Sequence, residues 1–143
     1  MMVAKMLIRG ATNASHRMGM VRHENTQPEL ALRKALTLRG LRYRIHRREL
    51  PGTPDIVFVS AKLAIFVHGC FWHRHASCRK STMPRSNIAF WAEKFEKNID
   101  RDEKSYATLE RRGWRFHLAW ECEIARDVDS CAEEVFRLVT LGQ

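Results

Sequence analysis

The sequence predicts a single domain of the mixed α/β class, and three observations support this prediction. The chain has 143 residues, enough for one compact domain with one hydrophobic core. Apolar residues make up 45% and charged residues 29% of the sequence, which is typical of folded globular proteins. Apolar patterns of helical and strand period follow one another in the order helix, three strands, helix, strand, helix, without repeats or internal linkers. We expect one domain over residues 17–143, preceded by a flexible basic arm over residues 1–16.

The first predicted helix begins near Thr26. Threonine followed three positions later by Glu29 forms a capping box, and Pro28 suits the first helical turn. Leucine and alanine then recur until Gly40, a residue type that commonly ends helices. The sequence therefore predicts an amphipathic helix that stops at Gly40.

Three strands, a long helix, a fourth strand and a last helix are expected after it. Residues 41–46 alternate apolar and basic side chains, which is typical of a half-buried strand. After a Pro- and Gly-rich turn, the apolar runs 56–59 and 63–67 predict a β-hairpin in the middle of the sheet. Apolar side chains at helical spacing predict a long helix that contains Trp91 and ends at Gly113. The remaining pattern predicts a strand over residues 114–120 and a helix over about residues 128–141.

The basic composition predicts an anionic partner. Lys and Arg number 25 against 16 Asp and Glu, which gives a formal net charge of +9. Nucleic acid is the commonest partner of so basic a domain, and an acidic membrane surface is the second choice. No apolar run approaches the ~20 residues that span a bilayer. We expect no secretory signal, because the apolar stretches near the N-terminus are too short for one. We expect a cytoplasmic protein with no membrane partner, whose four cysteines are reduced thiols rather than a disulfide framework.

The loop after the predicted hairpin is rich in cysteine and histidine. Cys70, His75 and Cys78 are spaced C-x4-H-x2-C, close enough for one loop to wrap a zinc ion, which favours four N or S ligands. Cys122, just past the end of a distant strand, is the expected fourth ligand, whereas Cys131 lies in the apolar pattern of the last helix. The alternative, that these cysteines are buried apolar residues, fits a polar, Arg-rich loop badly. We expect a closed, structural zinc site.

Asp55, His68 and His73 form a second candidate site. Asp55 begins one strand of the hairpin and His68 follows the other, so a carboxylate is expected to face histidines at a sheet edge. Such a carboxylate suits Mg²⁺ held against a phosphate, and histidine exchanges protons near neutral pH. Taken singly, Asp55 is more often a turn-capping residue and each histidine a packed one, so the prediction depends on their occurring together.

These motifs resemble those of the very short patch repair (Vsr) DNA mismatch endonucleases. The matching segments, in chain order, are PGTPD (51–55), VHGCFWH (67–73), FW with Lys94 (90–94), Asn98 with Asp102, GW (113–114) and WEC (120–122). The resemblance covers about residues 16–124, and HGCFWH is its most specific block. It implies a restriction-endonuclease-like fold, with a central mixed sheet flanked by helices. It also implies an enzyme that nicks one DNA strand next to a T:G mismatch by Mg²⁺-dependent phosphodiester hydrolysis and so initiates very short patch repair.

The resemblance implies a role for each catalytic candidate. Asp55 matches the essential metal-binding aspartate, and the main-chain carbonyl of Val67 matches a second contact to Mg²⁺. His73 matches the histidine that handles the proton of the attacking water, and Asp102 matches the acid that orients it. His68 takes a position where the wider nuclease fold often has lysine.

Further matches concern the metal-bound waters and the zinc. Glu29 matches an acid near the metal-bound waters of the family. Cys70, His75, Cys78 and Cys122 match the family's zinc ligands. The resemblance therefore implies the same four ligands as the spacing of these residues does.

Aromatic residues provide a candidate for mismatch recognition. Phe71 and Trp72 lie in a tight loop with basic neighbours, where large apolar side chains can wedge into a base stack. A wobble mismatch is easier to unstack than a paired base, which favours selectivity. The spacing of Trp91 and Phe95 alone predicts core packing, but the resemblance implies that Phe71, Trp72 and Trp91 insert beside the mismatch. Met18 matches a residue that closes over the DNA from the other groove.

Some positions depart from the family pattern. Val67 stands where threonine is more common, which is harmless if only its carbonyl contacts the metal and reduces activity if a hydroxyl helps. Gly19 replaces the usual arginine and His23 a common lysine, so we expect the N-terminal arm to hold phosphate more weakly.

Two hypotheses about function remain at this point, one an enzyme and the other a binding module. The first is the mismatch endonuclease, a monomer in the bacterial cytoplasm at the nucleoid, with T:G-mismatched double-stranded DNA as substrate and mismatch-repair proteins as candidate partners. The second is a non-catalytic, zinc-stabilised DNA-binding module for distorted DNA. Asp55 favours the enzyme, because a carboxylate directed at phosphate repels DNA unless a cation lies between them.

Overall fold

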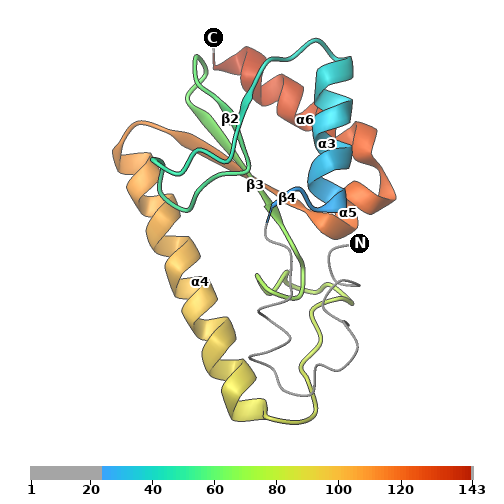
Figure 1. The fold of residues 1–143 in the computed structure, drawn as a ribbon, viewed down its shortest axis with the longest axis vertical. Coiled ribbons are helices and arrows are strands. Elements are labelled where there is room, and N and C mark those ends of the chain that lie inside the picture. The colour runs from blue at the N-terminus through green and yellow to red at the C-terminus, as the bar shows by residue number, and fades with distance from the viewer. Residues whose placement is uncertain (1–23, 143) are drawn as a thin grey trace.

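Figure 1 shows the computed structural model of the chain, which describes residues 24–142. The predicted arm over residues 1–16 lies outside the described residues, as do Met18, Gly19 and His23, so the boundary of the arm stays a prediction. The elements are α3 (Gln27–Leu38), β1 (Arg44–Ile45), β2 (Ile56–Phe58), β3 (Leu63–His68), α4 (Ile88–Arg111), β4 (Arg115–Trp120), α5 (Glu121–Arg126) and α6 (Val128–Leu141). Together they form the mixed α/β domain that the sequence predicts.

The strands form one sheet in the order β1–β2–β3–β4. β2 pairs antiparallel with β1 and with β3, so the predicted central hairpin is confirmed. β3 and β4 run parallel, and α4 makes the crossover connection that parallel neighbours require. The result is a mixed sheet flanked by helices, which agrees with the expected restriction-endonuclease-like fold.

Helices cover both faces of the sheet. Along β3, alternate side chains point to opposite faces. Leu63 and Ile65 belong to a core cluster that includes residues of α3, α5 and α6. Ala64 and Phe66 belong to a second cluster with Leu109 of α4. α4 therefore lies on one face of the sheet and the other three helices on the opposite face (Figure 1).

Two predicted details differ in the structure. The strand expected over residues 41–46 is reduced to Arg44–Ile45. It stops before His46, which adopts a φ of 49° and turns the chain out of the extended conformation. The short helix α5 was not predicted, since six residues between a strand and the Asp127 N-cap of α6 give too little periodicity to recognise. Cys122 therefore lies in a helix, directly after β4.

The other helices agree with their sequence signals. The Thr26 side chain accepts a hydrogen bond from the Glu29 amide at the start of α3. The Glu29 carboxylate reaches back to the amide of Asn25, one residue beyond the cap. Within residues 24–142, each helix is too short or too polar to cross a bilayer.

Candidate functional site

The predicted site residues gather around the end of β3. His68 is the last residue of this strand, and its side chain lies on the face that α4 covers. The loop that follows carries the HGCFWH block and leads to the start of α4 (Figure 1). Val67, one position earlier, packs its side chain against the core on the opposite face. Residues from both faces can therefore meet at this end of the sheet.

On the α4 face, two histidines and an aspartate form one group. The Nδ1 atom of His73 lies 2.6 Å from Oδ2 of Asp102. The rings of His73 and His68 are stacked, with centroids 3.6 Å apart and an interplanar angle of 7°. Asp102 fixes the Nδ1–H tautomer of His73, which leaves Nε2 as the nitrogen that can accept a proton. A histidine held in this way by a carboxylate is suited to activate a water molecule.

His68 itself is buried, with 4% of its surface exposed. Burial, and then the neighbouring His73, hold its pKa well below the ordinary value, so its imidazole is neutral near neutral pH. Its Nε2 atom lies 2.5 Å from the hydroxyl of Tyr106. No local sequence pattern distinguishes Tyr106 from a core tyrosine.

On the other side of β3, two carboxylates and a histidine form a second group. Oδ2 of Asp55 accepts a 2.7 Å hydrogen bond from the amide of Val67. Nε2 of His46 lies 2.6 Å from Oε2 of Glu29, which is 1% exposed. One ligand atom from each of Glu29, His46 and Asp55 lies within 4.8 Å of the others. These residues can together hold a cation.

The electrostatics of this group also favour a cation. Burial raises the pKa of the Asp55 carboxyl to about 7, and the negative charges of Glu29 and Glu24 add to this effect. The hydrogen bond from Val67 and the positive charge of Arg33 act in the opposite direction. A divalent ion would offset this local excess of negative charge, so the residues present fit a hard metal ion with oxygen ligands.

His46 was missed as a member of this group. Its backbone amide donates to the carbonyl of Asp55, and its side chain reaches Glu29 across the start of α3. The strand register pairs Ile45 with Ile56, so the next residue along, His46, lies beside Asp55. A register deduced from the predicted hairpin and the preceding strand could have placed these two residues together.

Four cysteine and histidine side chains converge as the sequence predicts. The ligand atoms of Cys70, His75, Cys78 and Cys122 lie within 4.8 Å of one another. The Sγ atoms of Cys70 and Cys122 lie 3.5 and 3.4 Å from Nδ1 of His75. Tetrahedral zinc with ordinary Zn–S and Zn–N bonds requires a sulfur-to-nitrogen separation of about 3.6 Å. The arrangement therefore fits a closed four-ligand metal site.

The surroundings of this cluster support the same assignment. The amide of Cys70 donates to Oε1 of the buried Glu121, and the ring of His75 stacks on Trp120 at 4.1 Å. Burial raises the pKa of the Cys70 thiol to about 12, so this group needs a nearby cation to ionise at neutral pH. Cys131 lies in α6 and packs against the core, as predicted. The structure thus separates one core cysteine from three candidate ligands.

The aromatic candidates lie in one cluster beside the site. The ring centroid of Phe71 lies 5.1 Å from that of Trp72 and 5.5 Å from that of Trp91. Phe71 and Trp72 are half-buried, whereas Trp91 is 4% exposed and packs on Phe95. The loop thus places Phe71 and Trp72 against Trp91 of α4, which is distant from them in sequence. Phe71 and Trp72 present the accessible part of this cluster.

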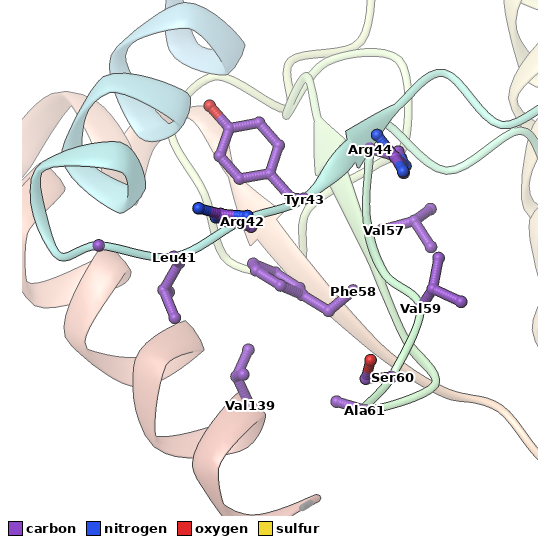
Figure 2. A pocket seen from close by; sticks show the side chains of 11 residues that line it. Leu41, Arg42, Tyr43, Arg44, Val57, Phe58, Val59, Ser60, Ala61 and Val139 are labelled. Atoms are coloured by element: carbon purple, nitrogen blue, oxygen red, sulfur yellow. The ribbon is translucent and has the colours of Figure 1, made fainter.

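A separate hollow lies at the β1 edge of the sheet. Its volume is about 440 Å³, and its lining includes Leu41, Tyr43, Phe58 and Val139 together with Arg42 (Figure 2). All of its lining residues lie outside the predicted site. The convergence of ionisable residues, and with it the candidate chemistry, is at the opposite end of β3.

Comparison with known proteins agrees with this geometry. Residues 9–80 match the family described as DNA mismatch endonuclease Vsr. The chain is 49% identical over 108 residues to the type II nicking enzyme V.XorIIP of Xanthomonas oryzae pv. oryzae, covering 76% of this chain and 79% of that protein. It is 42% identical to the type II nicking enzyme V.NmeAIP of Neisseria meningitidis, covering 83% and 84%. It is 38% identical to the DNA mismatch endonuclease Vsr of Escherichia coli, covering 77% and 70%. The chain therefore belongs to the Vsr family of DNA endonucleases.

Proposed function

We propose that this protein nicks one strand of double-stranded DNA beside a T:G mismatch by Mg²⁺-dependent hydrolysis, which initiates very short patch repair. Membership of the family makes the protein a DNA endonuclease, and the relatives named above are nicking and mismatch enzymes. The observation that carries the proposal is the convergence at the end of β3 of Asp55, anchored by Val67, and of His73, anchored by Asp102. A DNA-binding module without catalysis would need neither the contact between Asp55 and Val67 nor the contact between His73 and Asp102.

The residues divide the work of phosphodiester hydrolysis between the two faces of β3. Asp55 and the carbonyl of Val67 would hold Mg²⁺, with Glu29 close to its water ligands. The ion would polarise the phosphate and lower the pKa of bound water. His73 accepts the proton of the attacking water at Nε2, and Asp102 keeps the ring in the required tautomer and stabilises the imidazolium. The Val67 side chain packs into the core, so its replacement of threonine leaves the carbonyl available.

The cysteine and histidine cluster is proposed to hold structural zinc. Four protein ligands leave no position for a substrate water, so zinc has no part in the hydrolysis. Three of its ligands lie in the loop that also carries His73, Phe71 and Trp72. The ion would therefore fix the conformation of the loop that supplies both the proton acceptor and the aromatic cluster.

Recognition is proposed to combine charge with aromatic insertion. The net charge of +9 favours binding to the phosphate backbone of any duplex. Phe71 and Trp72, supported by Trp91, would enter the weakened stack at a mismatch. We propose that the protein acts as a monomer at the bacterial nucleoid, with mismatch-repair proteins as candidate partners.

The proposal is tested by the cleavage of end-labelled duplexes that differ at one base pair. Only one strand of the T:G duplex should be cut, and only when Mg²⁺ is present. The T:A and C:G duplexes of the same flanking sequence should be cut far more slowly. Equal cleavage of all three duplexes, or no cleavage of any mismatch in a panel with varied flanks, would contradict it.

Trp72→Ala is expected to weaken binding to T:G duplex by about 1–3 kcal/mol, the usual scale of one base–aromatic stacking contact. Binding to fully paired DNA should change much less, because that binding depends mainly on phosphate contacts. The preference for the mismatch should therefore approach unity while zinc content stays normal. Fluorescence anisotropy with both duplexes, at several salt concentrations, measures the two affinities.

Trp114→Ala is a matched control for this substitution. Trp114 precedes β4 and packs in the core at the far end of the sheet. Its loss should lower thermal stability but leave the mismatch preference intact. If Trp72→Ala instead weakens both duplexes equally, the aromatic cluster is scaffold and the mismatch is recognised elsewhere.

Mg²⁺ binding in the absence of DNA is expected to strengthen as the pH rises through about 7. Because the folded-state pKa of Asp55 is raised from 3.8 to about 7, the folded protein holds this proton more tightly than the unfolded chain. The burial of Asp55 therefore lowers the stability of the metal-free protein progressively as the pH rises from 3.8 to about 7. Mg²⁺ should raise the melting temperature more at about pH 8 than at about pH 6. In Asp55→Asn this pH dependence should disappear; if it persists unchanged, another group binds the ion.

A further inference from the structure

One face of α4 contacts both histidines of the site through side chains one turn apart. Asp102 contacts His73, and Tyr106, four residues later, contacts His68. Residues four apart lie above one another on the same helical face. The single helix α4 therefore sets the positions of both Asp102 and Tyr106, which contact the stacked imidazole rings.

Tyr106 is itself held firmly. Its ring stacks on Phe116 of β4, with centroids 4.5 Å apart and an interplanar angle of 12°. It also meets the ring of Phe66 edge-on, with centroids 5.4 Å apart. Two aromatic contacts at different angles restrict rotation of the phenol ring. The hydroxyl is therefore a fixed point from which a hydrogen bond can orient the His68 ring.

The orientation of His73 depends on more than Asp102. One hydrogen bond at Nδ1 fixes a single atom of the His73 ring, and the ring can still turn about that contact. The parallel stack with His68, 3.6 Å away, fixes the plane of the ring. The plane of His68 is in turn set by Tyr106 at Nε2 and by the edge-on contact with Trp120, whose centroid lies 5.3 Å away.

We propose that Tyr106 is a positioning residue for strand nicking. Its hydroxyl fixes the ring of His68, and His68 fixes the plane of His73 by stacking. Nε2 of His73 is thereby directed at the water molecule that attacks the phosphate. This inference rests on the proposed role of His73, and it adds to the site a positioning residue that neither sequence motif nor spacing indicates.

The chain offers a matched pair of substitutions, because it contains two tyrosines. Tyr106→Phe removes the hydroxyl from the site and retains the contacts with Phe66 and Phe116. Tyr43→Phe removes a hydroxyl that contacts Thr37 and the carbonyl of Arg33, at the other end of α3 from the site. The two variants differ only in which hydroxyl is lost.

The expected result is a selective loss of rate in Tyr106→Phe. Its single-turnover nicking rate should fall about 3- to 10-fold, the range expected for one intramolecular hydrogen bond. The concentration of DNA at half-maximal rate should not change, because Tyr106 makes no contact that the DNA would replace. Tyr43→Phe should nick at the wild-type rate. All rates are measured well below the melting temperature of each variant.

Imidazole resonances provide a readout that does not depend on activity. In Tyr106→Phe, the ¹⁵N signals of His68 should shift through loss of the hydrogen bond. The ring protons of His73 should also shift, because the ring current from a displaced His68 changes. Both residues should give wild-type spectra in Tyr43→Phe, and the His75 signals of the zinc-loaded protein should be unchanged in both variants.

The outcomes separate this inference from the proposed function. Wild-type nicking by Tyr106→Phe, a loss confined to DNA affinity, or unchanged His73 resonances would overturn the positioning role. If the wild-type protein itself failed to nick mismatched DNA, the proposed function would fall. The imidazole spectra would still decide whether Tyr106 orders the two rings. A reduced rate at constant affinity, together with shifted signals of both histidines, supports the inference.

Discussion

Asp55→Asn is expected to lower the rate of nicking at a T:G mismatch by about a thousandfold or more. The stabilisation that a metal ion gives to a phosphoryl transition state is worth several kcal/mol, and about 1.4 kcal/mol corresponds to a tenfold change in rate. The side-chain amide is a much weaker magnesium ligand than a carboxylate, so most of this stabilisation should be lost. Single-turnover cleavage at saturating enzyme and Mg²⁺ measures the effect.

The fold should survive this substitution. Asparagine has nearly the same shape as aspartate, and its side-chain oxygen can still accept the hydrogen bond from Val67. Removing a partly buried negative charge near phosphate should leave DNA binding without Mg²⁺ unchanged or slightly tighter. Anisotropy in the presence of a chelator measures this affinity, and zinc content measured separately shows whether the second site is intact.

A matched control is available on α4. Asp100→Asn removes an exposed carboxylate that pairs with Lys104 on the outer side of the helix. It should change neither nicking nor DNA affinity beyond a few tenths of a kcal/mol, the usual worth of an exposed i,i+4 pair. Near-native nicking by Asp55→Asn would mean that Asp55 is only a turn residue and that the proposed magnesium site lacks its main ligand.

Local signals were enough to predict most of the fold. The apolar runs of β2 and β3 and the Thr26 cap of α3 depend on neighbouring residues, and the structure confirms the elements they predict. β1 is shorter than expected, and at its end His46, which contacts Glu29 and Asp55, leaves the extended conformation. Tertiary contacts of this kind override the alternation of side chains along a segment.

The candidate site residues also divide into those that local sequence patterns indicate and those that only tertiary contacts bring together. Three of the four candidate zinc ligands lie in one loop, so their spacing alone indicates a shared ion. The contact of Tyr106 with His68 joins residues 38 positions apart, and it depends on how α4 crosses the sheet. Hydrophobic patterns give the face of a helix that is buried but not which side chain it meets. Tyr106 could therefore be recognised only in the folded chain, whereas the strand register could have placed His46 beside Asp55.

Removal of zinc is expected to unfold or greatly loosen the domain. Structural zinc in small domains contributes an apparent binding free energy of about 10–16 kcal/mol near pH 7, whereas a whole domain is stable by only about 5–15 kcal/mol. The protein as purified should contain one zinc ion per chain by elemental analysis. A zinc-selective chelator in excess Mg²⁺ should lower the melting temperature steeply and abolish near-ultraviolet circular dichroism.

Cysteine variants separate zinc binding from the general loss of a thiol. Cys78→Ser removes a candidate ligand that is only partly buried, so its main effect should be loss of zinc and of thermal stability. Cys131→Ser removes a cysteine of comparable exposure that lies in α6 and packs against the core, and this variant should keep its zinc with a modest change in stability. The two variants carry the same chemical change at different places.

Zinc loss should also abolish nicking, although zinc takes no part in the proposed hydrolysis. His73 lies between Cys70 and His75, so a loop released from the ion cannot keep the 2.6 Å contact between His73 and Asp102. Asp55→Asn, by contrast, should lose nicking while it retains zinc and melts near the native temperature. A zinc-free protein with native stability and full activity would show that the four ligand atoms are held together by packing alone, and that the loop needs no ion to present His73.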